Sequence, residues 1–285
     1  MLSLHTNAAA LSSQNAVGST QKQLSTSMQR LGTGYRINSA MDDAAGLQIA
    51  TRLNAQTRGM AVAQRNTQNG ISMMQTAEGA FKEVSDILLR MKDLATQAAN
   101  ATATAKDQDA MQSEFDALGL ELDNIANNTS FGGSKLLKGG TIASAITFQV
   151  GAGSSETMSV NLSGAMSALD TALTGVSVNY SGAAKGTELT ATGSANGMID
   201  MISTAIDAVG TVRSALGAAS NRLDHINNNL SNMSTNTTEA RSRIMDVDYA
   251  SEAANMTSKQ MLMQAGTAML KQSSSMSQLV MSLMQ

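Results

Sequence analysis

The chain contains no proline, no cysteine and no tryptophan, and aromatic residues make up only 2% of its 285 positions. The absence of proline removes every forced helix break, and the 21 methionines add a residue that favours helix. The absence of cysteine excludes disulfide bridges and thiolate metal sites. The composition therefore favours a helical chain without a disulfide framework.

Strong charge and long apolar runs are also missing. The net charge is −3, which argues against a nucleic-acid partner held by bulk electrostatics. No apolar run approaches the roughly 18 residues of a membrane span, so we expect no membrane partner. The first residues, Met1 to Thr6, lack the basic region and apolar core of a signal peptide. We expect any export to use a route without a cleaved signal peptide.

A seven-residue repeat dominates the C-terminal third, and all but one of its members are apolar. They are Ile202, Val209, Leu216, Leu223, Leu230, Thr237 and Ile244. Apolar residues at one heptad position form a stripe that faces a partner helix. The repeat predicts a helix from Gly197 to Asp246, about 75 Å long, which needs an equally long partner.

The N-terminal half supplies such a partner. A predicted helix ending near Ala99 carries two seven-residue series offset by three and four positions, as in a coiled coil. The series are Met74, Phe81, Leu88, Ala95 and Ala77, Val84, Met91, Ala98. A third predicted helix follows a break at 101–105 and carries Met111, Phe115, Leu118, Leu122 and Ile125 on one face.

The periodicity then changes to two. Ile146, Phe148 and Val150 alternate with polar residues, as do Met158, Val160 and Leu162, which predicts a β-hairpin. A Gly/Ser/Thr-rich stretch continues to about Asn196, and we expect this middle part to be the least helical and most exposed.

Both chain ends carry thinly apolar helices. The first is predicted from about Ser3 to Leu31, and the last follows a charged break near Asp246 and carries no charge from Gln272 onward. Each stripe alone buries too little to offset the ordering entropy. Two interpretations stay open: the ends pair with each other and with neighbouring subunits at the axis of a helical polymer, or they are disordered tails.

A polar turn separates the first two helices. Ser39 is predicted to be the N-cap of the second helix, with Asp42 and Asp43 in its first turn, where negative charge suits the helix dipole. The two aspartates could also form a metal or acid–base pair, but no His or Glu stands at ligand spacing.

Several motifs resemble those of the bacterial flagellins. The N-terminal ones are RLGTGYRINSAMDDAAGL at 30–47 and GISMMQTAEGA at 70–80; the C-terminal ones are ARSRI to DYA at 240–250 and QAGT at 264–267. The resemblance covers about residues 1–150 and 197–285 in unbroken order. One departure is Ser273 to Met276, where the family commonly has a proline-containing segment.

The resemblance implies a mainly α fold, with long antiparallel coiled-coil helices from both chain ends and a small β-hairpin region in the middle. It implies an inner-tube domain (1–40 and 250–285), a rod-like domain with the hairpin (41–150 and 197–249) and a short variable outer loop (151–196). We expect a short flagellin without large outer domains. The implied function is a subunit of the hollow flagellar filament, the propeller of swimming or swarming cells.

The implied partners are further copies of the chain, an export chaperone, and the cap and hook-junction proteins. The implied location is the extracellular flagellum, reached by type III export, with no cofactor and no metal. The inner-tube packing residues are expected to be Leu4, Leu11, Leu24, Leu31, Leu262, Met269, Met276 and Leu283. The rod-domain seam is expected to be Met74, Phe81, Leu88, Ile202, Val209, Leu216, Leu223 and Leu230.

A second surface also resembles a known one. Residues Leu89 to Gln97 resemble the flagellin surface that a vertebrate Toll-like receptor binds, and Arg90, Leu94 and Glu114 match its central contacts. Without the resemblance, Arg90 and Glu114 read as an ordinary solvated helix face.

Two rival functions are considered. A hook–filament junction protein shares the terminal-helix architecture but occurs in few copies. An enzyme lacks candidates for its site, because the chain has only His5 and His225, no cysteine and no carboxylate constellation away from helix ends.

Overall fold

The computed structural model of the chain describes residues 7–182, 185–191 and 193–283, with side chains described as far as Ser275. The chain divides into two compact units, which we call the terminal unit (Met1–Thr57 and Thr235–Gln285) and the central unit (Arg58–Ser234). Helices dominate both units and two small antiparallel sheets occur in the middle of the chain, which confirms the predicted fold class.

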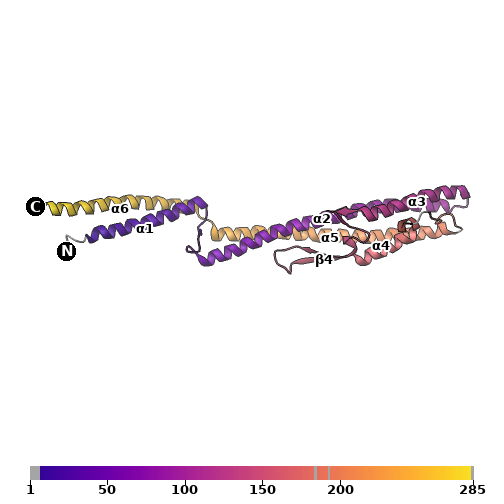
Figure 1. Ribbon diagram of the computed structural model, residues 1–285, viewed down its shortest axis with the longest axis horizontal. Helices are drawn as coiled ribbons and strands as arrows, with labels where there is room; N and C mark the ends of the chain where they lie inside the picture. The colour runs from indigo at the N-terminus through magenta and orange to yellow at the C-terminus, as the bar shows by residue number, and fades with distance from the viewer. Residues whose placement is uncertain (1–6, 183–184, 192, 284–285) are drawn as a thin grey trace. The chain divides into compact units, whose positions relative to one another are not determined.

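The terminal unit is built on an antiparallel pair of helices, α1 (Ala8–Thr33) and α6 (Tyr249–Leu283), which lie side by side (Figure 1). Asn7 caps α1 by accepting a hydrogen bond from the Ala10 amide at 3.0 Å. The amide of the same Asn7 side chain donates to the Ser273 carbonyl, so the start of one helix meets the far part of the other. Both predicted terminal helices are thereby confirmed.

The connection from α1 to α2 (Ala44–Ala98) differs from the prediction. Asp43, and not Ser39, caps α2, because its Oδ1 accepts from the Gly46 amide at 2.8 Å. Asp42 lies before the helix in a tight turn, where its carboxylate accepts from the amides of Asn38 and Ser39. These bonds hold the pKa of Asp42 below its usual value. Ser39 and Asp42, which were expected to start α2, therefore belong to the turn that precedes it.

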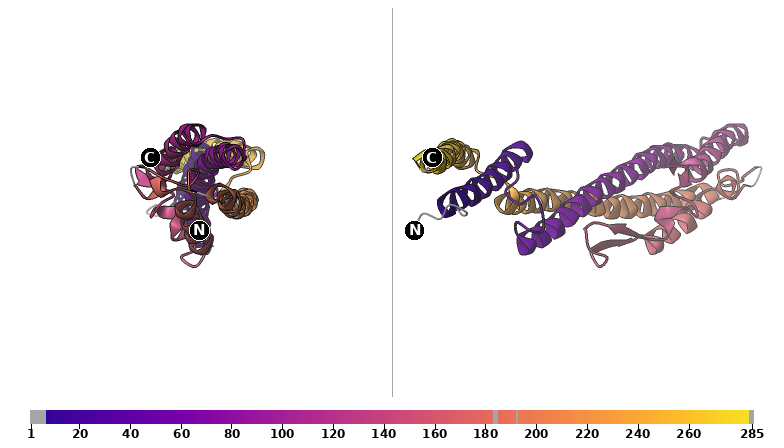
Figure 2. Two further views of the ribbon diagram at one scale, coloured as in Figure 1. Left: turned by 90° about the vertical axis from the view of Figure 1, so that its right-hand side faces the viewer. Right: turned by 60° about the vertical axis from the view of Figure 1, so that its left-hand side comes forward.

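The central unit contains most of α2 together with α3 (Ala105–Asn128) and most of α5 (Ser194–Met245) (Figure 2). Helices α2 and α5 run antiparallel, since Glu78 approaches Arg213 and Gly70 lies against Leu223. Thr104 and Asp107 form a reciprocal capping box that starts α3 after the predicted break. The three long helices of this unit were all predicted, with ends that differ by a few residues.

The heptad stripes of α2 and α5 form the core of the central unit. Each predicted seam residue is buried, with no more than 5% of its surface exposed, and most show none: Met74, Phe81, Leu88, Ile202, Val209, Leu216, Leu223 and Leu230. Phe115 and Leu122 of α3 pack into the same core. We call these eight residues of α2 and α5 the seam.

The predicted hairpin is present as β3 (Ala145–Gln149) and β4 (Thr157–Asn161), after a short ribbon of β1 (Ser130–Phe131) and β2 (Ser134–Lys135). Ile146 pairs with Val160 and Phe148 with Met158, so the alternating apolar residues share one face. That face turns toward the core, where Phe148 comes close to Gly70 of α2.

The middle of the chain is its least helical part, as predicted, but the prediction that it is also the most exposed part was wrong. Helix α4 (Ser163–Val176) and a 3-10 turn, η2 (Val178–Ser181), follow the hairpin, and another 3-10 turn, η1 (Thr141–Ala143), precedes it. Met166, Leu169, Leu173 and Val176 of α4 are buried in the central core. Their spacing of three and four is helical, and burial here overrides the loop preference of the surrounding Gly, Ser and Thr residues.

Hydrogen bonds fasten the segment after η2 to α3. The buried Gln112 amide donates to Asp116 and Glu188 and accepts from the Leu189 amide at 2.7 Å. Glu188 in turn accepts from the Val178 amide. A buried amide that makes all these bonds offsets its desolvation, so this segment belongs to the core layer rather than to a free loop.

Adjacent leucines on α2 give a matched test of the seam. Leu88→Ala is expected to lower the unfolding free energy by about 2–5 kcal/mol, because Leu88 is fully buried and truncation leaves a cavity. Leu89→Ala is expected to change it by only about 0.5 kcal/mol, because Leu89 is 52% exposed. Urea unfolding followed by circular dichroism measures both, and equal losses contradict this packing.

Candidate assembly surfaces

The α1–α6 pair buries few of its own side chains. Among the described side chains, α1 buries only Leu24 and Ser27, and α6 buries only Glu252. Six large apolar side chains of the two helices stay exposed instead: Leu11, Met28, Tyr249, Met261, Leu262 and Met269. A helix pair that leaves this much apolar surface in water is suited to bury it against another molecule.

The expected inner-tube residues fall into two groups, those that are buried within the helix pair and those that are exposed. Leu24 is buried at 4% exposure and Leu31 is half-buried, so both contribute to packing within the pair. Leu11, Leu262 and Met269 are 56%, 59% and 66% exposed, so they face away from it. Leu4 lies outside the described residues, as do the side chains of Met276 and Leu283.

Polar side chains link the two helices at the end near the chain connection. Lys259 Nζ donates to Ser27 Oγ at 3.0 Å. The Tyr249 hydroxyl donates to the Leu31 carbonyl at 2.6 Å. Directed hydrogen bonds of this kind fix which residues lie opposite one another, which a sparse apolar stripe does poorly.

An ion pair joins the same region. The Arg30 guanidinium lies 3.9 Å from the Glu252 carboxylate, whose side chain is only 10% exposed. Arg30 Nε and Glu252 Oε1 are both buried without a hydrogen-bond partner. This pair was not predicted from the sequence, although Glu252 and Lys259 stand seven residues apart and so repeat one heptad position.

A short antiparallel bridge between Tyr35 and Asp246 closes the terminal unit. The Arg36 amide donates to the Met245 carbonyl at 2.6 Å, and the Val247 amide donates to the Gly34 carbonyl at 3.0 Å. Gly34 has φ 76°, a left-handed conformation that ends α1 and turns the chain into this bridge. The two connecting segments are therefore tied to each other by backbone bonds.

The three residues expected to contact a receptor lie on α2 and α3. Arg90 and Glu114 form an ion pair in which Arg90 Nη2 lies 2.6 Å from Glu114 Oε1, and both side chains are about half exposed. Leu94 is 2% exposed and packs in the central core. The structure thus brings Arg90 and Glu114 together on the surface and places Leu94 beneath it.

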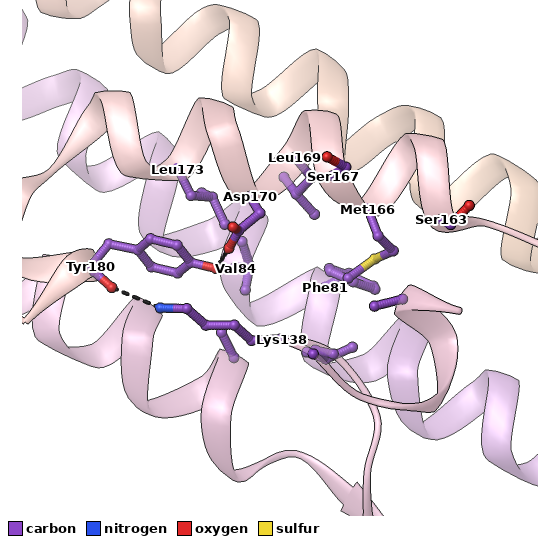
Figure 3. A pocket seen from close by; sticks show the side chains of 14 residues that line it. Phe81, Val84, Lys138, Ser163, Met166, Ser167, Leu169, Asp170, Leu173 and Tyr180 are labelled. Atoms are coloured by element: carbon purple, nitrogen blue, oxygen red, sulfur yellow. Dashed lines mark hydrogen bonds between the residues drawn. The ribbon is translucent and has the colours of Figure 1, made fainter. Parts of the chain in front are cut away.

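A pocket of about 230 Å³ lies between α2, α3 and α4 (Figure 3). Phe81, Leu169 and Met166 form part of its apolar lining. Its charged groups are engaged within the chain: Lys138 Nζ bonds to Asp123 and to the Tyr180 carbonyl, and the Tyr180 hydroxyl donates to Asp170.

Lys138 also lies over the Tyr180 ring, 4.1 Å from its centroid. Burial and the nearby Asp170 raise the pKa of the Tyr180 hydroxyl well above its usual value, so this group remains a donor. The polar side of the pocket is therefore a closed network that fastens η2 to the core.

The described part of the chain contains no group of three or more His, Cys, Asp or Glu side chains that could hold a metal ion. None of its helices combines the length and the apolar character needed to cross a membrane.

The paired terminal helices of one unit and the long helices of the other agree with the family comparison. Residues 4–141 match the bacterial flagellin N-terminal helical region, and residues 199–284 match the bacterial flagellin C-terminal helical region. The chain belongs to the flagellin family.

Individual relatives give the extent of the likeness. The chain is 50% identical over 161 residues to Flagellin C of Vibrio cholerae, which is 56% of this chain and 42% of that protein. It has the same identity, over the same lengths, to polar flagellin F of Vibrio parahaemolyticus. The matched part thus spans less than half the length of these relatives.

A solved structure of a flagellar hook-associated protein from Vibrio parahaemolyticus has a TM-score of 0.56 to this chain. The match covers 72% of this chain and 100% of the chain in that structure, at 16% sequence identity. A likeness at this identity shows that the two share a fold.

The Arg30–Glu252 pair can be tested by charge exchange. Arg30→Ala is expected to cost about 1–3 kcal/mol of local stability, because it leaves the nearly buried Glu252 carboxylate without its cation. Arg30→Glu is expected to lower the local stability further, and combining it with Glu252→Arg is expected to restore part of that stability. Amide hydrogen exchange of α1 between Leu24 and Thr33 reports these local openings.

Lys22→Ala is the control, because Lys22 is exposed on the same helix. An Arg30→Ala chain that exchanges no faster than the Lys22→Ala chain contradicts a stabilising role for the pair.

Proposed function

We propose that the chain is a structural subunit that assembles with many copies of itself into the hollow helical filament of the bacterial flagellum. The observation that carries the proposal is the α1–α6 pair of a flagellin-family chain, which leaves six large apolar side chains exposed. Burial of these side chains against further copies supplies a driving force for assembly.

The mechanism is mechanical rather than enzymatic. A contact that joins different surfaces of successive copies and does not close into a ring extends into an open helix. The low charge of the two terminal helices supports their burial in such a polymer, because every buried charge there meets copies of itself. A rotary motor turns the resulting filament as a propeller.

The domain assignment follows as a proposal. Residues 1–40 and 250–285 line the inner tube, and residues 41–150 and 197–249 form the surrounding rod-like domain with the seam as its core. Residues 151–196 form the outer part, which α4 and η2 make more compact than a loop. Leu4, Met276 and Leu283 are assigned to the inner tube on the heptad pattern alone.

The proposed location and partners follow from the filament role. The subunit is exported without a cleaved signal peptide to the extracellular flagellum, and it meets an export chaperone, the cap and the hook-junction proteins. A hook–filament junction protein is the alternative, because it has the same architecture. The number of copies in sheared filaments separates the two, since a junction protein is present in only a few.

Elongation from filament seeds tests the assembly surface. Leu262→Glu is expected to abolish elongation and leave the unfolding free energy of the unassembled chain within about 0.5 kcal/mol, because Leu262 is 59% exposed there. Leu120→Glu is the control, since Leu120 of α3 is 53% exposed in the central unit. Electron microscopy and sedimentation measure filament length and yield.

A chain truncated before Ser251 lacks nearly all of α6 and is also expected not to elongate. Normal filaments from the truncated chain or from Leu262→Glu contradict the proposed inner-tube role. A full chain that stays monomeric with cap and seed present favours the junction-protein alternative.

We also propose that the unassembled chain engages a vertebrate Toll-like receptor through the surface around Arg90 and Glu114. Both side chains are about half exposed and are joined by an ion pair, so they present one continuous polar surface across α2 and α3. Leu94 supports this surface from the core, at 2% exposure.

Arg90→Ala is expected to lower activation of receptor-bearing reporter cells by about tenfold, because an interface arginine is often among the residues that dominate binding. Lys82→Ala is the control, since Lys82 forms an exposed ion pair with Asp86 elsewhere on α2. The receptor proposal fails if the parent chain does not activate these cells, or if both variants lose the same share of that activation.

A further inference from the structure

Among the described side chains of α1 and α6, methionine supplies three of the six large apolar ones that are exposed. Met28 is 47% exposed, Met261 is 60% exposed and Met269 is 66% exposed. The methionines in the core of the central unit are far less accessible: Met74 and Met91 have no exposed surface. The thioethers of Met28, Met261 and Met269 therefore belong to the apolar surface that the described part of the pair leaves uncovered.

The chain contains no cysteine, so thioether sulfur is the only sulfur it offers to an oxidant. We propose that Met28, Met261 and Met269 form a redox-sensitive modification site, whose oxidation to methionine sulfoxide by a hydroperoxide blocks addition of the subunit to a filament. This inference rests on the proposed filament function, and it assigns to the same surface a control by oxidation state.

The chemistry is a two-electron oxygen transfer. A lone pair on the methionine sulfur attacks the terminal oxygen of hydrogen peroxide, an S–O bond forms, and the O–O bond breaks. The departing oxygen leaves as water after proton transfer, so the sulfur is oxidised and the peroxide is reduced. Each methionine gains one oxygen, and sulfoxide reductases reverse the change.

The physical effect follows from the change in polarity. A thioether is apolar and adapts to irregular contacts, whereas a sulfoxide is polar and strongly hydrated. Burying a sulfoxide against a second copy requires the loss of that hydration without a built partner. The fold of the unassembled chain is unaffected, because these three side chains already contact water there.

The position of the site also limits when the modification occurs. In the unassembled chain the three sulfurs meet solvent oxidants. In a filament built on this surface they are covered by neighbouring copies, so the finished polymer resists the same dose. The sensitive stage is the subunit before its addition.

The experiment treats the full unassembled chain with hydrogen peroxide, removes the oxidant, maps the added oxygen by peptide mass spectrometry, and then measures elongation from untreated seeds. We expect oxygen at Met28, Met261 and Met269 well before Met74 and Met91, unchanged helical content, and elongation slowed by at least about tenfold. Treatment with methionine sulfoxide reductases A and B is expected to restore elongation.

Matched variants locate the effect. The triple variant Met28→Leu, Met261→Leu and Met269→Leu is expected to elongate normally after peroxide treatment. The control variant Met41→Leu and Met201→Leu removes two exposed methionines, 97% and 51% exposed, that lie on neither α1 nor α6, and is expected to stay sensitive. A triple variant as sensitive as the parent overturns the assignment.

Two other results overturn the inference. One is an oxidised parent chain that carries oxygen at all three positions and elongates at the untreated rate. The other is oxidation of these methionines in finished filaments as fast as in the unassembled chain. By contrast, an untreated parent chain that does not elongate refutes the proposed filament function itself. The positions of the added oxygen in the unassembled chain test the accessibility of the three methionines whether or not the chain elongates.

Discussion

The burial of one apolar stripe of α2 against one of α5 is the interaction on which the central unit depends. Neither stripe can be buried within its own helix, so each needs the other as a partner, and the two helices meet antiparallel. This single requirement aligns residues from both halves of the chain and creates the surface on which α3, α4 and the hairpin pack. Surface residues on two different helices, such as the Arg90–Glu114 pair of α2 and α3, depend on this core for their relative positions.

The terminal unit differs from the central unit, because its helices are not held together by a buried apolar stripe. Its two helices bury few of their own side chains, and polar contacts such as the hydrogen bond from Lys259 to Ser27 help to align them. Apolar side chains that a monomer would normally hide are left in water. In the proposed filament, further copies of the chain cover this exposed apolar surface.

Long, regular patterns could be predicted from the sequence, and irregular ones could not. The seam, the five long helices and the β3–β4 hairpin each repeat a period over many residues. The flagellin motifs at 70–80 and 264–267 lie on the long helices, whereas those at 30–47 and 240–250 span the connections between helices. Helix α4 was missed because its four buried apolar residues are diluted by Gly, Ser and Thr. Ser39 was misassigned because Asp42 binds the turn amides and leaves Asp43 to cap α2. The Arg30–Glu252 pair joins positions at opposite ends of the chain, which local spacing cannot connect.

The antiparallel meeting of α2 and α5 has a kinetic consequence. Glu78 and Arg213 approach each other although more than a hundred positions separate them along the chain. Closing so long a loop by chance contact is slow, whereas α3, the hairpin and α4 are joined by short connections. Folding is therefore expected to begin in these middle elements, which bring the facing ends of α2 and α5 together. The seam then closes turn by turn away from them.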